Sequence, residues 1–303
     1  MERAGDGLVA WLGSAEGGPD ELGGKAASLD RLGRFGFRIP PGFCLTTTAF
    51  RTQFAALPEA RVVLQSLIET GDTALGTELA SILAESPLAQ PIADALEPAL
   101  AAIDLGARAR SGAAARLAVR SSAIGEDSSA ASYAGLHETE LDRSVDEVAG
   151  AVKRCWASLW SRPALAYRVR RGLPLDDAAM AVVVQELVPA DAAAVVFTRH
   201  PVTGREDQVV ITAIRGLGEA MVSGTVTPDT YVVDRPSRGV AEFTPGDDIE
   251  RPLDAPALTA LVDLVLEVEA QYGAAVDVEA AMSGGIWYLL QARPITTGAA
   301  VLP

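Results

Sequence analysis

The strongest constraint on the fold is a change in residue pattern that begins at Gly172. Before it, the chain from Thr46 to about Leu105 is rich in alanine and leucine and has short breaks, which predicts several helices. After it, runs of β-branched residues predict strands, interrupted by one amphipathic helix over 255–272. Helical segments followed by strands are typical of an α+β fold. We therefore predict two subdomains, 1–178 and 179–303.

The charge balance limits the partners of the chain. It has 40 acidic and 25 basic side chains among 303 residues, so its formal charge is -15. Such a surface repels polyanions, which argues against nucleic acid or an anionic membrane as the main partner. A phosphate ligand would therefore need a local basic site or a bound metal ion.

The cysteines and the hydropathy pattern indicate where the chain resides. Cys44 and Cys155 are too few and too far apart to form a disulfide framework or a zinc site. The first residues lack the basic and apolar segments of a signal peptide, and no run of about 18 uncharged apolar residues could span a bilayer. We expect a cytoplasmic protein whose chemistry depends on lysine, arginine, carboxylates and a bound ion.

Lys25 is the first candidate site residue. It follows two glycines, and Ala26, Leu29 and Leu32 recur after it at helical spacing, so it is predicted to start a helix. The helix dipole disfavours a lysine at this end unless an anion is bound, and a phosphate would remove that conflict. The alternative is a solvated lysine at a frayed helix end.

Arg120 is the second candidate. It is predicted to end a strand over 116–120, where Ser121 and Ser122 add polar groups as the chain leaves the core. A guanidinium group there is suited to phosphate oxygens because its donors form a planar fork. The alternative is a structural ion pair with one of the acidic residues. The small-residue loop over 125–135 either covers a ligand or is an ordinary connection.

The last two strands predict a hairpin. Glu279 and Gln291 are twelve residues apart and centred on Gly285, so a hairpin would place them opposite each other. Counting by twos from Trp287 puts Leu289 and Gln291 on one strand face.

By the same count Arg293 shares the face of Gln291, and Asp277 shares that of Glu279. A magnesium ion held by Glu279 and Gln291, with Arg293 on the attached phosphates, would satisfy these polar groups. The alternative is a plain Glu–Arg pair in a sheet.

Two other features carry weaker signals. The segment Gly216-Leu217-Gly218-Glu219 has backbone amides that could approach an anion, but an ordinary turn is the simpler interpretation. His137 and His200 are interpreted as structural or exposed, because His200 precedes a proline in a turn and His137 enters a strand.

Together these motifs resemble the nucleotide-binding domain shared by phosphoenolpyruvate synthase, pyruvate phosphate dikinase and rifampin phosphotransferase, an ATP-grasp-type module. They span nearly the whole chain in the order of that family. The matching stretches are Leu22-Gly23-Gly24-Lys25-Ala26-Ala27-Ser28-Leu29; Ala118-Val119-Arg120-Ser121-Ser122-Ala123 with Glu126-Asp127, Ala134-Gly135 and Glu138-Thr139; Cys155-Trp156-Ala157-Ser158-Leu159; Phe197-Thr198; Gly216-Leu217-Gly218-Glu219-Ala220; Pro228-Asp229; and Gln291-Ala292-Arg293-Pro294-Ile295-Thr296.

The resemblance implies a two-lobed ATP-grasp-like fold with a full set of ATP and magnesium ligands. Lys25, Arg120 and Arg293 would grip the phosphates during transfer, and Glu279 and Gln291 would hold Mg²⁺. Gly135, Thr139 and Glu140 would lie in a loop over the nucleotide. Gln185 would lie near the adenine, in the cleft between the subdomains.

The resemblance also implies an activity. The family cleaves ATP to AMP and moves the β-phosphoryl group to a histidine on a separate swivelling domain. Neither His137 nor His200 lies in the Thr-Ser-His setting of that histidine. We therefore expect the phosphohistidine domain to lie on another polypeptide or in a removed part of a larger enzyme.

Two other functions stay open at this point. One is a stand-alone ATP-grasp kinase or ligase that acts directly on a small acceptor. The other is a nucleotide-responsive binding partner without turnover. The presence of all five residues Lys25, Arg120, Glu279, Gln291 and Arg293 disfavours the binding partner, because a scaffold would not require them together.

Overall fold

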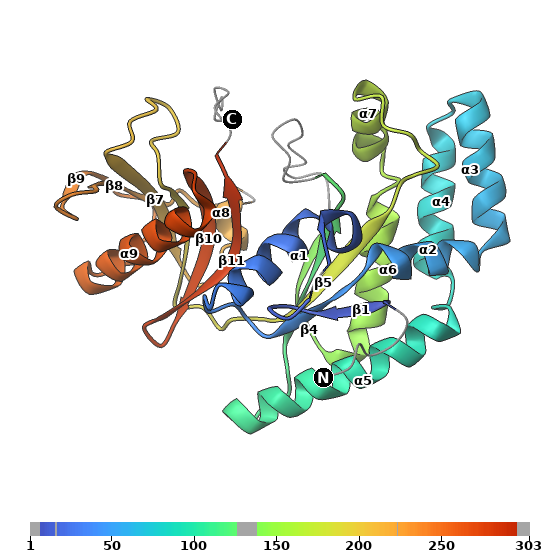
Figure 1. The fold of residues 1–303 in the computed structure, drawn as a ribbon, viewed down its shortest axis with the longest axis horizontal. Helices are drawn as coiled ribbons and strands as arrows, with labels where there is room; N and C mark the ends of the chain where they lie inside the picture. Colours follow the sequence, from blue (N-terminus) through green and yellow to red (C-terminus); the bar gives the residue numbers. More distant parts are fainter. Residues whose placement is uncertain (1–6, 16, 126–137, 223, 296–303) are drawn as a thin grey trace. The chain divides into compact units, whose positions relative to one another are not determined.

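The computed structural model describes residues 7–15, 17–125, 138–222 and 224–295. It confirms a mixed α+β content, and contacts divide the chain into two compact units (Figure 1). The first unit comprises residues 1–30 and 41–187, and the second comprises 31–40 and 188–303.

This division differs in two ways from the sequence boundary at residue 178. Strand β5 (Met180–Glu186) pairs with β2 (Gly42–Leu45) and β3 (Leu117–Ala123), so the first unit continues to Leu187. The segment 31–40 belongs to the second unit, where the Leu289 N–H donates to the Arg38 carbonyl at 2.9 Å. Both differences arise from pairings between residues far apart in sequence.

The first unit contains a five-stranded antiparallel sheet in the order β1-β2-β5-β3-β4. Its two remaining strands are β1 (Val9–Trp11) and β4 (Thr139–Arg143). Leu117, Val119 and Ala123 of β3 belong to a hydrophobic cluster on one face of this sheet. Since side chains alternate along a strand, Arg120 lies on the opposite face. Strand β3 continues three residues beyond Arg120, because the backbone that follows still pairs with β5.

Helices surround this sheet, and local sequence signals explain several of their ends. The Thr46 hydroxyl caps the first turn of α2 by accepting the Ala49 N–H at 3.4 Å. Gly112 ends α5 in the left-handed conformation. Ser144 and Glu147 form a capping box, in which the Glu147 carboxylate accepts the Ser144 N–H at 2.8 Å. The helices are α1 (Pro19–Arg34), α2 (Thr47–Ala55), α3 (Pro58–Thr70), α4 (Ala74–Glu85), α5 (Gln90–Ser111), the 3-10 turn Val145–Glu147, α6 (Val148–Ser158) and α7 (Arg162–Arg170).

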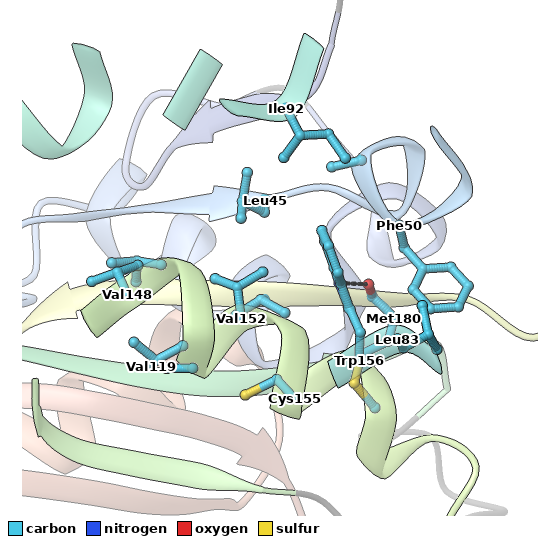
Figure 2. Packing of buried hydrophobic residues seen from close by; sticks show 14 of the residues in the cluster. Leu45, Phe50, Leu83, Ile92, Val119, Val148, Val152, Cys155, Trp156 and Met180 are labelled. Atoms are coloured by element: carbon cyan, nitrogen blue, oxygen red, sulfur yellow. Dashed lines mark hydrogen bonds between the residues drawn. The ribbon is translucent and has the colours of Figure 1, made fainter. Parts of the chain in front are cut away.

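Helix α6 supplies the centre of the first hydrophobic core. Figure 2 shows Val148, Val152, Cys155 and Trp156 on one face of α6, and all four are buried. The Trp156 indole Nε1–H donates to the Met180 carbonyl at 3.1 Å. This bond satisfies the polar atom that a buried tryptophan brings into the core and ties α6 to β5.

The second unit contains a six-stranded antiparallel sheet in the order β11-β10-β6-β7-β8-β9. Its strands are β6 (Ala192–Phe197), β7 (Gln208–Arg215), β8 (Asp229–Asp234), β9 (Val240–Thr244), β10 (Val276–Ser283) and β11 (Ile286–Pro294). Strand β9 is at the edge of this sheet. That strand is short and mostly exposed at the sheet edge, so it carries little hydrophobic pattern.

Helix α9 (Ala255–Tyr272) covers one face of the second sheet over the range predicted from the sequence. The Asp254 side chain accepts the Ala257 N–H at 2.8 Å at its start, and Gly273 ends it in the left-handed conformation. Its apolar face joins the core of this unit through Leu261 and Val265. A short helix, α8 (Glu219–Val222), follows β7. Within the described ranges, no helix combines the length and apolarity needed to cross a membrane.

Candidate functional site

Lys25 lies in the first turn of the longer part of α1. A kink at Gly23, with φ 70° and ψ 173°, divides this helix, so regular helical structure resumes just before Lys25. Such torsion angles are accessible essentially to glycine alone. The predicted position of Lys25 at a helix start is thus confirmed. The dipole argument applies there, because the first turn of a helix favours a bound anion.

Arg120, Thr139 and Gln185 lie on the face of the first sheet that is turned away from its hydrophobic cluster. Arg120 on β3 is directly opposite Thr139 on β4. Gln185 on β5 is opposite Ala118, which shares the face of Arg120 by alternation. This face therefore gathers a guanidinium group, a hydroxyl and a buried amide.

Glycine 42 makes room for the amide on this face. Gly42 on β2 is directly opposite Gln185, which is only 2% exposed. A Cβ atom on Gly42 would lie 2.6 Å from Gln185 Cγ, so the packing of Gln185 requires glycine at this position. In the sequence, Gly42 follows Pro40 and Pro41, a run that indicates a turn but does not reveal this contact with Gln185.

Glu140 lies on the other side of the first sheet. It is opposite Val119, whose side chain faces the hydrophobic cluster. Arg154 on α6 donates to both Glu140 carboxylate oxygens, at 2.5 and 2.7 Å. Glu140 and Arg154 also line an open cavity of about 640 Å³. The structure therefore does not bring Glu140 together with Arg120 and Thr139.

Two residues from the sequence analysis lie outside the described residues. They are Gly135, expected in the loop over the nucleotide, and His137. His200 is described, and its Nδ1 accepts the N–H groups of Val202 and Thr203 at 3.2 and 3.3 Å. These bonds close a turn, which agrees with the structural interpretation of His200.

The predicted pairing of Glu279 and Gln291 is confirmed. They are direct partners in the β10–β11 hairpin, and two residues further along in the same register Asp277 lies opposite Arg293. The hairpin turns at Gly284 and Gly285, both with positive φ, as a tight two-residue turn requires. A β-bulge between Glu279 and Ala280 inserts Leu290 as an extra residue on β11 and shifts the register beyond it by one residue.

This bulge corrects the predicted faces of β11. Trp287 and Leu289 belong to the core beneath α9, and the Trp287 Nε1–H donates to the Ala257 carbonyl at 3.1 Å. Counting by twos placed Gln291 and Arg293 on that same face, which is wrong because the extra residue reverses the alternation. After the bulge, Ala292 faces the core instead.

The opposite face of this hairpin carries the polar groups. Gln291 and Arg293 lie there beside Glu279 and Asp277, since the core positions of β10 are its alternating Val276, Val278 and Ala280. This arrangement gathers two carboxylates, an amide and a guanidinium group on one surface of the second unit.

Asp277 and Arg293 form an ion pair within this group. The Arg293 Nε–H donates to Asp277 Oδ2 at 2.7 Å. Burial raises the pKa of the Asp277 carboxyl, while the neighbouring guanidinium opposes that rise. Arg293 is thus paired with Asp277, and Glu279 lies opposite Gln291 in the hairpin.

Glu279 and Gln291 fit a magnesium site that is completed by a ligand. Magnesium prefers oxygen donors and commonly takes one or two protein side chains together with substrate phosphates. One carboxylate and one amide oxygen on adjacent strands supply that set. Across the described part of the chain, no three His, Cys, Asp or Glu side chains gather as a metal site made of protein ligands alone.

The two thiols are unsuited to nucleophilic chemistry. Cys44 and Cys155 are both free and buried, and burial raises the pKa of each well above its usual value. For Cys155, the nearby Lys25 opposes this rise without cancelling it. The thiols are therefore left out of the candidate chemistry.

Sequence comparison identifies relatives of the chain. The sequence profile of the pyruvate phosphate dikinase AMP/ATP-binding domain matches residues 19–251. A rifampicin phosphotransferase from Streptomyces sp is 37% identical over 301 residues, which cover 91% of this chain and 34% of the relative. A probable phosphoenolpyruvate synthase from Archaeoglobus fulgidus is 36% identical over 318 residues, which cover 95% of this chain and 42% of the relative.

A third relative and a solved structure complete the comparison. The prodigiosin synthesizing transferase PigC of Serratia marcescens is 37% identical, with 93% of this chain and 32% of the relative covered. The chain thus spans less than half the length of each of these three relatives. The D-alanine–D-alanine ligase of Helicobacter pylori matches 66% of this chain and 47% of its own, with a TM-score of 0.31 and 11% identity.

Proposed function

Because the chain belongs to the pyruvate phosphate dikinase AMP/ATP-binding domain family, we propose that it binds ATP and Mg²⁺ and supplies a phosphoryl group to a separate acceptor. The acceptor is a histidine on another chain or on another part of a larger enzyme. The group transferred is the β-phosphoryl group, and AMP is released. An ATP-grasp-like fold that comprises the two units is part of this proposal.

The observation that carries the proposal is the register of the last hairpin. It pairs Glu279 with Gln291 and sets Arg293 two residues further along the same face. A carboxylate and an amide suit a hard cation, and a guanidinium group suits phosphate oxygens. All three lie on the face of the hairpin opposite the hydrophobic core, where Glu279 and Arg293 are partly exposed and Gln291 is buried.

The first unit supplies the other proposed ligands. Lys25 and Arg120 bind phosphate oxygens, one from a helix start and one from a sheet face. Thr139 is opposite Arg120 and contacts the nucleotide, while Gln185 lies near the adenine. Glu140 and Gly135 complete the proposed set, although Glu140 is held by Arg154.

The chemistry needs charge neutralisation more than a protein nucleophile. Phosphoryl transfer proceeds largely through positioning and electrostatic stabilisation of the transferring group. Magnesium, when bound by Glu279 and Gln291, would neutralise charge on the phosphates. Lys25, Arg120 and Arg293 hold the phosphate oxygens and so keep the transferring group aligned with its acceptor.

Calorimetric titration with ATP, with and without MgCl₂, tests the binding site. Lys25→Ala should weaken ATP binding, whereas the control Lys153→Ala, at a lysine that donates to the Ser86 carbonyl, should not. Glu279→Gln should reduce the gain in affinity from MgCl₂, and Glu267→Gln on the exposed side of α9 should leave it unchanged. Normal ATP binding by Lys25→Ala or Arg293→Ala would refute the site assignment.

Product analysis tests the proposed reaction. The chain is incubated with ATP and MgCl₂, with and without a candidate histidine-domain protein, and AMP is separated from ADP. AMP that forms only with the histidine-domain protein supports transfer of the β-phosphoryl group. ADP that forms only with a small acceptor would instead favour a stand-alone kinase or ligase.

A further inference from the structure

Ser122 connects the strand that carries Arg120 to the helix that carries Lys25. The Ala26 N–H donates to Ser122 Oγ at 3.0 Å, and the Ser122 hydroxyl donates to the Leu22 carbonyl at 2.8 Å. These two backbone groups lie on either side of the kink at Gly23. A single side chain from β3 thus bridges the break in α1. In the sequence, Ser122 is 96 positions from Ala26 and 100 positions from Leu22.

This contact replaces bonds that the kink removes from α1. At a helix start, the first N–H groups have no carbonyl of the same helix to donate to. Before a break, a carbonyl likewise lacks the N–H group that would donate to it in a continuous helix. The hydroxyl of Ser122 serves both needs because it donates and accepts at once. Ser122 is fully buried, so water does not compete for these bonds.

Glycine at position 23 permits this close approach. A Cβ atom at Gly23 would lie 2.0 Å from the Ser122 carbonyl oxygen and 2.4 Å from its Oγ. The backbone of α1 therefore rests directly on β3 at this point. Alternation along β3 places Ser122 on the face of Arg120, because their neighbours Val119 and Ala123 face the hydrophobic cluster.

We infer that Ser122 is a positioning residue that fixes the backbone of Lys25 relative to Arg120. Lys25 directly precedes Ala26, whose N–H is held by the Ser122 hydroxyl. Arg120 lies two residues before Ser122 on the same strand face. The hydroxyl thereby fixes the position of Lys25 on α1 relative to Arg120 on β3, so that both side chains can bind the same phosphates. This inference rests on the proposed function, since it concerns how the chain holds the phosphates of ATP.

Ser121 provides a matched control in the neighbouring position. It is also buried, at 1% exposed, but it lies on the opposite face of β3 and pairs with Val182. Its hydroxyl has no hydrogen-bond partner in the described part of the chain. Loss of the Ser121 hydroxyl therefore removes the same atom from the same strand without touching the link to α1.

The test compares ATP with adenosine, which lacks phosphates. Dissociation constants are measured by calorimetric titration for the wild-type chain, Ser122→Ala, Ser121→Ala and Lys25→Ala. Ser122→Ala should weaken ATP binding by roughly tenfold, because a displacement of about 1 Å in a binding group is already costly. Its affinity for adenosine should stay unchanged, and Ser121→Ala should alter neither affinity. A general loss of the folded structure would instead lower the affinity for ATP and for adenosine to the same extent.

Ser122→Cys gives a second readout if Ser122→Ala does not fold, since it keeps the shape but bonds more weakly. It should show the same selective loss of ATP affinity. An unchanged ATP affinity in the folded Ser122 variants, while Lys25→Ala loses affinity, would overturn this inference alone. A wild-type chain that binds no ATP would overturn the proposed function and, with it, the role of Ser122.

Discussion

Replacement of Gly23 by alanine tests the close approach of α1 to β3. The added methyl group would lie 2.0 Å from the Ser122 carbonyl oxygen and 2.4 Å from Ser122 Oγ. Ordinary contacts between non-bonded carbon atoms begin near about 3.5 Å, so either the helix or the strand must move. The substitution also forces alanine into a backbone region that only glycine occupies readily.

The expected cost follows from these contacts. The backbone strain contributes about 1–3 kcal/mol. Displacement of Ser122 removes two hydrogen bonds, each worth about 1 kcal/mol net. Together they predict a loss of about 3–5 kcal/mol in the free energy of unfolding, a large part of the roughly 5–15 kcal/mol that holds a typical protein folded.

Gly112→Ala separates the steric part of this cost from the backbone part. Gly112 lies in the same unit with φ 75°, and no heavy atom lies within 4 Å of its missing Cβ. It should lose only about 1–2 kcal/mol, the cost of a left-handed conformation for a residue with a Cβ atom.

Urea denaturation followed by tryptophan fluorescence measures both variants. Trp11, Trp156 and Trp160 lie in the first unit and Trp287 in the second, so the signal reports mainly on the unit that is changed. If Gly23→Ala costs no more than Gly112→Ala, the argument from close approach is refuted.

Three further changes have expected outcomes that the same assay measures. Trp156→Phe removes the indole that bonds to the Met180 carbonyl, so stability should fall by about 2–3 kcal/mol, and a loss below about 0.5 kcal/mol would contradict that contact. Ser121→Ala removes a buried hydroxyl that lacks a partner in the described part of the chain, so stability should rise by about 1 kcal/mol, and a fall would indicate a hidden partner. Burial raises the pKa of Asp277 above its usual 3.8, so the native state binds this proton more tightly than the unfolded state does. The stability of the wild-type chain relative to Asp277→Asn should therefore fall as pH increases from about 4 through the raised pKa, and a pH-independent difference would refute the assignment.

Features set by neighbouring residues were predictable from the sequence. The range of α9 follows from its apolar periodicity together with Asp254 before it and Gly273 after it. The capping box at Ser144 and Glu147 is likewise a local pattern. In both cases the residues that decide the structure lie within a few positions of the element, so no knowledge of the tertiary fold was needed.

Features set by distant pairings were not predictable. Strand β5 belongs to the first unit because it pairs with β2 and β3, and its hydrophobic run alone does not reveal those partners. The placement of Glu140 against Arg154 also depends on the packing of α6. The link from Ser122 to α1 crosses about a hundred positions, and Gly23-Gly24 marked the turn without indicating what it contacts.

The bulge at Leu290 explains how a tight hairpin can also present a polar pair. The two-residue turn at Gly284 and Gly285 sets the pair Ala280–Leu289, and an uninterrupted ladder would next bring Leu290 opposite Glu279.

In that ladder Gln291 and Arg293 would fall opposite Val278 and Val276, and both would point into the apolar core beneath α9. Burial of an unpaired guanidinium group there would cost several kcal/mol. One extra residue on β11 reverses the alternation, so Glu279 lies opposite Gln291 and Asp277 lies opposite Arg293 on the polar face. The spacing of twelve residues between Glu279 and Gln291 therefore works as a pairing signal only because the strand contains this irregularity.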